Sequence, residues 1–204
     1  MNNFRTKRLA RAGVIAAMYV AFTFLVLPLA SGAIQFRVSE ALTLLPLFYV
    51  EAIPALFIGC MLANIISGAV IWDVIFGSVI TLVAASITYL CGKFIRNNHL
   101  RILTGGLAPV FLNAFLLPVI WYFAYGQLEY VYIAQVGFLV LGQGVAIYVL
   151  GSLLYYGLLA LQKKGIKVLM PFNNNVAQAC NNSTSIKEED LELKDNSSDK
   201  KGNE

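Results

Sequence analysis

The chain has 204 residues, of which 58% are hydrophobic and only 13% are charged. A soluble domain is typically about 45–50% apolar and about 25% charged, so this composition excludes an ordinary soluble domain. Uncharged apolar runs of 18 or more residues recur along the chain, which predicts a polytopic, all-α membrane protein.

The net charge of +4 does not indicate a nucleic-acid partner, because the charges are distributed unevenly. Residues 1–164 hold ten of the fifteen basic residues and four acidic ones, whereas the last forty residues hold five basic and seven acidic ones. No basic groove interleaved with aromatic residues is evident. We therefore expect no nucleic acid among the partners.

An enzyme is not expected either. The three cysteines have no paired spacing, so the sequence predicts neither a disulfide framework nor a metal site. The chain lacks a phosphate-binding P-loop, a zinc-protease motif and a nucleophile elbow, and we expect no cofactor. Its single histidine, His99, lies among basic residues and is interpreted as a solvated loop residue.

Six transmembrane helices are predicted. The first, Gly13 to Ala30, follows four basic residues and should be kinked by Pro28. It resembles a signal peptide, but its apolar stretch is longer than the usual ~7–15 residues, so we interpret it as a retained helix. The second is the weakest, because residues 41–50 cannot cross ~30 Å of hydrocarbon unless the helix starts within 34–40. The other four are expected at 52–71, 74–91, 102–124 and 131–161.

The basic residues support this count. With six spans, nine of the ten membrane-proximal basic residues lie on the inner side, and Arg37 alone lies outside. We therefore expect both termini in the cytoplasm and a multi-pass protein of the bacterial cell membrane. The expected organisation is a basic N-terminus (1–12), a six-helix domain (13–164) and a polar, disordered cytoplasmic tail (165–204).

The stretch from Ile34 to Glu40 places an amide, a guanidinium and a carboxylate between two uncharged runs. Ionisable groups within membrane segments are costly to desolvate and are usually paired or functional. Arg37 and Glu40 would share a face of a helix and could pair with each other. A solvated loop with a local ion pair is the alternative.

Other polar and aromatic residues gather at the same outer level under this topology. Asp73 could simply be the N-cap of the fourth helix, Glu129 a solvated turn residue, and the deeper amides hydrogen-bonding contacts between helices. Their shared depth nevertheless favours a binding site. The candidates are Gln35, Arg37, Glu40, Asn64, Trp72, Asp73, Asn113, Trp121, Tyr122 and Glu129, with Gln135 and Gln143 nearby.

Small residues form two stripes with a spacing of four. One stripe runs through the first helix at Gly13, Ala17 and Ala21, with Ala12 and Ala16 beside it. Such stripes let helix backbones approach closely, so this one indicates either internal packing or a partner protein. For the second stripe, Gly77-Thr81-Ala85 in the fourth helix, we favour internal packing.

Two strings give these features a family resemblance: Arg37-Val38-Ser39-Glu40-Ala41-Leu42 and Trp72-Asp73-Val74-Ile75-Phe76-Gly77. Together with Gly59 to Asn64, they resemble the QueT family, which are substrate-binding S components of energy-coupling factor (ECF) transporters. The resemblance covers about residues 8–165 and leaves the tail outside.

The resemblance implies a protein that captures a queuosine precursor, a 7-deazaguanine such as preQ1 or preQ0, from outside the cell. It also implies docking through Gly13, Ala16, Ala17 and Ala21 onto a transmembrane coupling subunit driven by two ATP-binding subunits. In this reading Glu40 binds the guanine edge, Arg37 or Asn64 lies near the carbonyl, and Glu129 meets the amine. Trp72, Trp121 or Tyr122 would stack on the ring.

Two alternatives remain open. An S component for another vitamin-like molecule would have the same fold, and only ligand binding would distinguish it. A non-transport membrane protein would neither associate with ATP-binding subunits nor bind a water-soluble ligand tightly.

Overall fold

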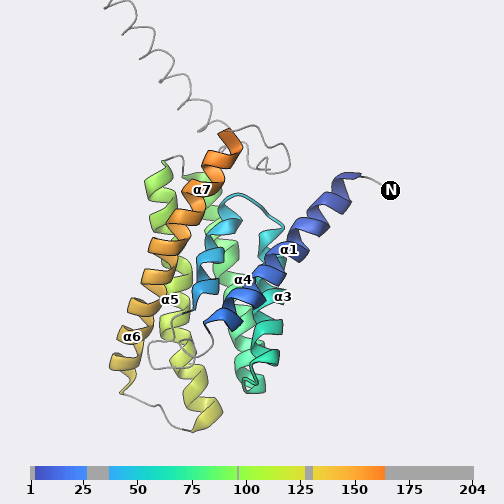
Figure 1. Ribbon diagram of the computed structural model, residues 1–204. Coiled ribbons are helices and arrows are strands. Elements are labelled where there is room, and N and C mark those ends of the chain that lie inside the picture. The colour runs from blue at the N-terminus through green and yellow to red at the C-terminus, as the bar shows by residue number, and fades with distance from the viewer. Residues whose placement is uncertain (1–2, 27–36, 96, 127–130, 164–204) are drawn as a thin grey trace, which may run out of the picture.

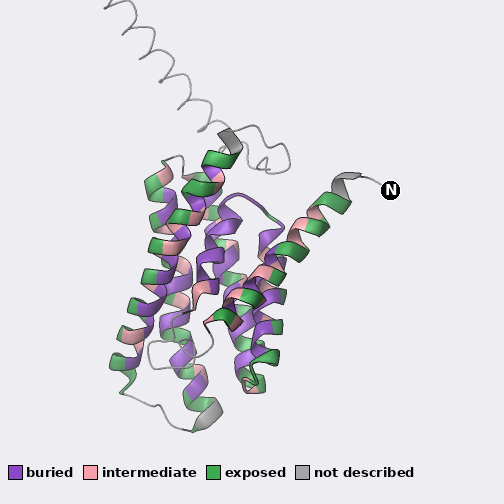
Figure 2. Cartoon of the chain, viewed as in Figure 1, coloured by how far each residue is buried: buried purple, intermediate pink, exposed green. Residues whose placement is uncertain are grey.

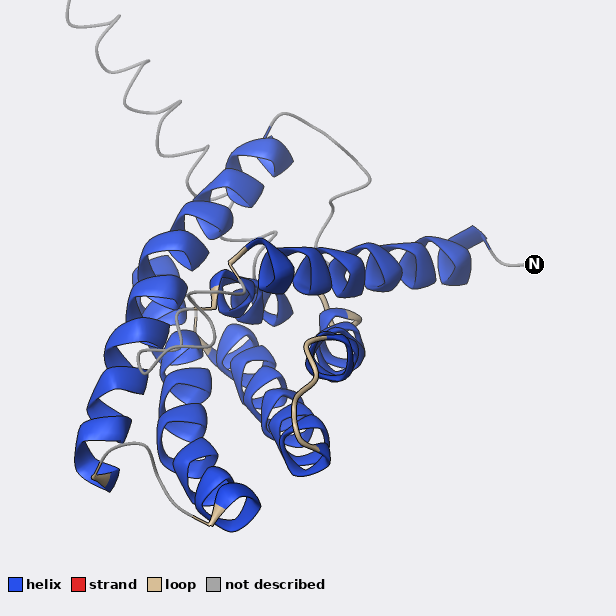
Figure 3. Cartoon of the chain, turned by 60° about the horizontal axis from the view of Figure 1, so that its bottom comes forward, coloured by secondary structure: helices blue, strands red, loops and turns tan. Residues whose placement is uncertain are grey.

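The computed structural model describes residues 3–26, 37–95, 97–126 and 131–163. Its described residues form helices and connecting turns, with no strand among them (Figure 3). The elements in chain order are α1 (Asn3–Leu25), η1 (Val38–Leu47), α3 (Ala52–Ile66), α4 (Ile71–Phe94), α5 (Asn98–Tyr125), α6 (Tyr132–Val145), η2 (Ala146–Gly151) and α7 (Ser152–Lys163).

Four stretches are long and apolar enough to cross a membrane: Thr6–Leu25, Ile71–Phe94, Asn98–Phe123 and Tyr132–Leu161. The last runs through α6, the π-helical η2 and α7 as one continuous rod. The helices α1, η1, α3, α4 and α5 and the rod from α6 to α7 run in alternating directions. The start of α1 and the end of α7 therefore lie at the same end of the bundle (Figure 1). An even number of membrane passes places the first and last helix ends on the same side. That the number of passes is six remains a prediction.

The element predicted as the second span is a 3₁₀ helix, η1, at the centre of the bundle (Figure 2). A 3₁₀ helix rises about 2 Å per residue, so the ten residues of η1 reach about 20 Å, more than an α-helix of that length. Every residue from Ser39 to Leu47 is buried. A mostly apolar helix is stable only when other elements surround it, and α1, α3, α4, α5, η2 and α7 all contact η1.

Three glycines let the surrounding helices close around η1. A Cβ on Gly92 of α4 or Gly105 of α5 would lie 3.1 Å from Leu47 atoms. A Cβ on Gly151 of η2 would lie 2.8 Å from Leu44 Cδ1. Side chains at these positions would push α4, α5 and η2 away from η1, so the packing of the core depends on the missing Cβ atoms.

The structure corrects several predicted helix ends. α1 starts at Asn3 instead of Gly13, because the basic residues and alanines before Gly13 are good helix formers that continue the helix. α3 ends at Ile66 instead of Ile71, since Gly68 adopts a left-handed φ of 75°. Pro28 and the tail lie outside the described residues.

α4 and α5 begin earlier than predicted. α4 starts at Ile71 with Val70 as its N-cap, so the interpretation of Asp73 as the N-cap is wrong. α5 starts at Asn98, where the side chain of Asn97 accepts a hydrogen bond from the His99 backbone N–H. His99 is therefore an exposed residue of a helix, hydrogen-bonded to the Tyr156 hydroxyl, and not a loop residue.

Charged residues at the end where α1 begins are held by contacts within the protein. Glu51, at the start of α3, pairs with Arg11 of α1 over 2.6 Å, and the Arg11 guanidinium lies 5.0 Å from the Tyr49 ring centroid. The fully buried Arg101 of α5 donates to the Gly92 carbonyl in the last turn of α4. Cations near the C-terminal end of a helix are stabilised by its dipole.

Candidate functional site

Glu40 is the most deeply buried acidic residue of the described chain, with 2% of its surface exposed. Its Oε1 accepts a hydrogen bond from the Tyr19 hydroxyl over 3.2 Å. Its Oε2 is also buried and has no hydrogen-bond partner among the described residues. A buried carboxylate oxygen without a partner costs stability, so this atom is suited to accept a hydrogen bond from a ligand.

α1 and η1 are joined by a second buried hydrogen bond one helical turn from Tyr19. The Thr23 hydroxyl lies 3.0 Å from the Ser39 hydroxyl and 2.9 Å from the Tyr19 carbonyl. Tyr19 and Thr23 were not among the predicted site residues. The available signal was their spacing of four, which places two polar groups on one face of an otherwise apolar helix.

Arg37 precedes η1 with an extended backbone (φ −109°, ψ 108°). The predicted ion pair between Arg37 and Glu40 is not formed between their described side chains. The prediction required both residues on one helix, whereas Arg37 lies before the first turn and only its carbonyl contacts the Glu40 backbone N–H, at 3.1 Å. The guanidinium is nevertheless close enough to Glu40 and Asp73 to interact with both electrostatically.

Asp73 lies in the first turn of α4 and is 6% exposed. An acidic side chain in this position is favoured by the helix dipole. Its Oδ1 would be 3.5 Å from a Cβ at Gly77, so the carboxylate lies along the glycine face of the helix. A partly buried guanidinium and two buried carboxylates thus come from three separate parts of the chain: Arg37 just before η1, Glu40 within η1, and Asp73 in α4.

Asn64 of α3 connects the α3 and α4 sides of this site. Its Nδ2 lies 3.4 Å from the Asp73 carbonyl and 3.7 Å from Cys60 Sγ. The Thr81 hydroxyl of α4 donates to the same sulfur over 3.4 Å. Gly77, Thr81 and Ala85 are all buried, as expected for a stripe that packs inside the protein. Cys60 and Thr81 are further residues of this cluster that the site prediction missed.

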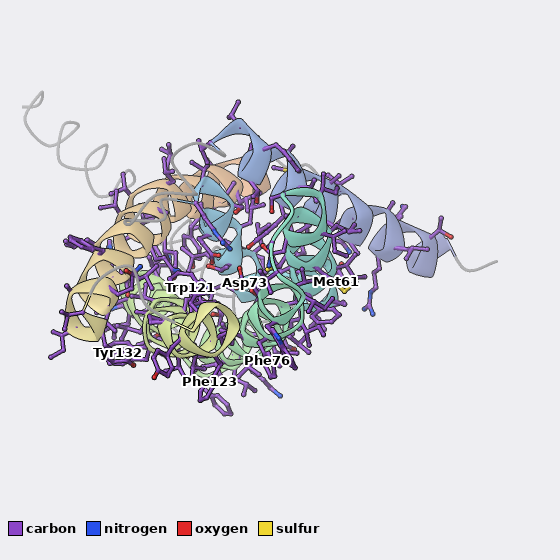
Figure 4. All side chains as sticks on the ribbon, turned by 90° about the horizontal axis from the view of Figure 1, so that it is seen from below. Met61, Asp73, Phe76, Trp121, Phe123 and Tyr132 are labelled. Carbon is purple, nitrogen blue, oxygen red and sulfur yellow. The ribbon has the colours of Figure 1, made fainter. Side chains whose placement is uncertain are left out.

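The three candidate stacking residues occupy different surroundings. Trp72 and Tyr122 are 52% and 55% exposed, and Trp72 stacks on Phe76 with the ring centroids 5.9 Å apart. Trp121 is buried against Leu117, Leu139 and neighbouring apolar residues. Seen from below, Asp73 and Trp121 lie towards the interior of the bundle, while Phe76, Phe123 and Tyr132 lie along its outer side (Figure 4). The structure therefore leaves Trp121 as the buried aromatic candidate.

Asn113 of α5 and Gln143 of α6 contact each other and not Glu40. Asn113 Nδ2 donates to Gln143 Oε1 over 3.0 Å, and both side chains are buried. This geometry matches the alternative in which these amides hold two helices together. Gln35 and Glu129 lie outside the described residues, so their predicted contributions stay predictions.

The predicted docking residues on α1 do not all face the same way. Gly13, Ala17 and Ala21 are exposed, whereas Ala16 is partly buried. The Ala16 carbonyl would lie 3.2 Å from a Cβ on Gly59 of α3, so Ala16 belongs to the contact between α1 and α3. The exposed residues recur every four positions and form a strip of small side chains, which we call the α1 strip (Gly13, Ala17 and Ala21).

Comparison with known proteins adds a family to this geometry. The family model described as QueT transporter matches residues 9–160. A curated protein, the queuosine precursor transporter QueT of Lactococcus lactis subsp. cremoris (strain MG1363), is 37% identical over 92 residues. The match covers 44% of this chain and 54% of that relative, so the chain spans about half of the relative's length. No solved structure matches the chain.

Proposed function

Since the chain belongs to the QueT transporter family, a family of multi-pass membrane proteins, we propose that it captures a queuosine precursor at the site around Glu40. The observation that carries the proposal is Glu40 Oε2, a buried carboxylate oxygen without a hydrogen-bond partner among the described residues. A ligand that donates to this atom supplies the missing bond and gains a charge-assisted contact.

A 7-deazaguanine fits the groups that surround Glu40. Its guanine edge presents two neighbouring N–H donors, which a carboxylate can accept in bidentate fashion. Its carbonyl requires a hydrogen-bond donor, for which the Arg37 guanidinium and the Asn64 amide are the candidates. The flat ring system requires an apolar or aromatic surface, for which Trp121 is the buried candidate.

An aminomethyl group on such a ligand would bring a positive charge into the site. With Glu40 and Asp73 ionised, the two carboxylates exceed the single charge of Arg37, so a cation is favoured over a neutral substituent. Asp73 is the described carboxylate that could meet this charge, and Glu129 is the second candidate. The site is therefore better suited to the aminomethyl precursor than to the nitrile precursor.

The α1 strip supports the proposed role in an ECF importer. Small side chains let another helix approach closely, and Gly13, Ala17 and Ala21 are exposed along one side of α1. In this proposal they contact a transmembrane coupling subunit, and two ATP-binding subunits of the same module supply the energy. The chain itself binds the ligand and delivers it to the importer.

The experiment is identification of the molecule that co-purifies with the detergent-solubilised protein. The protein is expressed in cells that make or receive queuosine precursors, denatured, and its released ligand is analysed by mass spectrometry. We expect a 7-deazaguanine in about equimolar amount. A different vitamin-like molecule in that amount would contradict the proposed substrate, and the Glu40→Gln protein, carried in parallel, should retain much less of the ligand.

A further inference from the structure

The two oxygens of Glu40 have different surroundings, and one side chain produces the difference. Oε1 accepts from the Tyr19 hydroxyl, whereas Oε2 is buried without a partner among the described residues. A carboxylate held at one oxygen cannot rotate freely about its last side-chain torsion. The position of the open oxygen therefore depends on the position of the Tyr19 hydroxyl.

Tyr19 is itself held tightly in place. It is 1% exposed, and Gly59 of α3 packs directly against it. A Cβ on Gly59 would lie 2.9 Å from Tyr19 Cβ and 3.2 Å from its Cγ, so even an alanine there would force the tyrosine to move. α1 and α3 together thus hold the hydroxyl in a defined position.

A guanine-like edge requires a particular orientation of the carboxylate that binds it. Its two N–H donors lie in the plane of the ring, so a bidentate contact requires the carboxylate to lie in that plane. An oxygen can accept two hydrogen bonds, so Oε1 can accept from Tyr19 and from the ligand together. Holding the carboxylate before the ligand arrives removes an ordering cost from binding.

We propose that Tyr19 is a positioning residue for the ligand, which orients the Glu40 carboxylate so that both of its oxygens meet the guanine edge. The inference rests on the proposed function, because it assumes that Glu40 binds a 7-deazaguanine. Tyr19 acts through Glu40 and does not need to touch the ligand. Removing the Tyr19 hydroxyl should therefore weaken recognition of the 2-amino group, the donor that distinguishes guanine from hypoxanthine.

The test compares two ligands that differ by one donor. Isothermal titration of the purified full-length protein uses 7-aminomethyl-7-deazaguanine and the analogue that lacks the 2-amino group, 7-aminomethyl-7-deazahypoxanthine. Tyr19→Phe keeps the ring and removes the hydroxyl. We expect it to weaken binding of the guanine form roughly threefold to tenfold, as for loss of a typical hydrogen bond, and to leave the analogue almost unchanged.

Two further variants make the result specific. Thr23→Val removes the neighbouring hydrogen bond between α1 and η1 without touching Glu40, and should preserve the ratio of the two affinities. Gly59→Ala displaces the Tyr19 ring while keeping every polar group, and should reduce that ratio as Tyr19→Phe does. It also serves as the test variant if Tyr19→Phe does not fold.

The outcomes separate the inference from the proposed function. If Tyr19→Phe weakens both ligands by the same factor, Tyr19 is only part of the packing and the inference is overturned. The inference is also overturned if Gly59→Ala and Tyr19→Phe both leave the ratio of the two ligand affinities unchanged. If the unmodified protein binds neither ligand, the proposed substrate itself is wrong, and the inference falls with it.

Discussion

Two buried glutamates in this protein, Glu51 and Glu40, have different interaction partners. Glu51, which is 9% exposed, has its charge balanced by Arg11 at 2.6 Å, and Arg11 in turn lies over the Tyr49 ring. Glu40, which is 2% exposed, receives one hydrogen bond from a neutral hydroxyl and keeps one oxygen unpartnered among the described residues. The desolvation of Glu51 is offset by a cation in contact with it, whereas Oε2 of Glu40 has no hydrogen-bond partner among the described residues.

The comparison separates the end of the bundle that is held by an internal ion pair from the end at which we propose that the ligand binds. The turn at Glu51 joins η1 to α3 and is fixed by contacts made inside the chain. Glu40 lies where α1, η1, α3 and α4 contribute polar groups that are only partly satisfied by one another. The four predictions below test this difference, beginning with the largest effect.

The first prediction is the direction of the two ends in the membrane. A cysteine placed at Asn98, near the end of the bundle that holds Glu51, should be protected from an impermeant thiol reagent in intact cells. A cysteine at Gln127 should react, because the charge asymmetry of the sequence predicts that this residue lies outside. Cell lysis should make both positions reactive. The reverse labelling pattern would place the Glu40 site on the cytoplasmic side and contradict capture from outside.

The second prediction separates transport from ligand binding. Ala17→Trp places a bulky side chain in the α1 strip and should abolish uptake and co-purification with the coupling subunit, because the helices can no longer approach closely. Ligand affinity should stay nearly unchanged, since Ala17 faces away from the contact between α1 and η1. Ala10→Trp, at an exposed position outside the strip, is the matched control. Equal loss of ligand binding in Ala17→Trp would show that the strip packs internally.

The third prediction concerns the charge of the ligand. Asp73→Asn keeps the size of the side chain and removes one negative charge from the site. Affinity for 7-aminomethyl-7-deazaguanine should fall roughly tenfold, as expected for loss of a charge-assisted contact. Affinity for the neutral 7-cyano-7-deazaguanine should change little, so titration with both ligands gives the comparison. A similar loss for both would assign Asp73 to the packing of α4.

The sequence predicted the fold well where long apolar runs determine it. α4, α5 and the rod from α6 to α7 have the expected order and nearly the expected bounds, because hydrophobicity alone specifies a membrane-length helix. The 3₁₀ conformation of η1 was not predictable in this way. The close packing of α4, α5 and η2 around η1 was not predictable either, because the three glycines that allow it meet η1 only in the folded chain.

The candidate site also combines residues that can be recognised in the sequence with contacts that exist only in the folded chain. Glu40, Asp73 and Asn64 stand out in the sequence as polar residues in apolar surroundings. The structure buries all three, with Asn64 Nδ2 at 3.4 Å from the Asp73 carbonyl. The Arg37–Glu40 ion pair, which the sequence allowed as an alternative, is not formed, because Arg37 lies before the first turn of η1. Tyr19 was missed because a tyrosine in a transmembrane helix is ordinary, and its contact spans 21 residues of sequence. Such distant contacts require the packing of α1 on α3.

The most direct measurement compares Glu40→Gln with Glu51→Gln in the same assay. Both variants keep the side-chain size and remove one buried charge, and each is titrated with 7-aminomethyl-7-deazaguanine and melted in detergent. Glu40→Gln should weaken binding roughly tenfold to over a hundredfold, because it sets a donor against a ligand donor, and should melt near the unmodified protein. Glu51→Gln should melt at a lower temperature and bind normally. Unchanged affinity with a lowered melting temperature in Glu40→Gln would show that Glu40 supports the structure and does not bind the ligand.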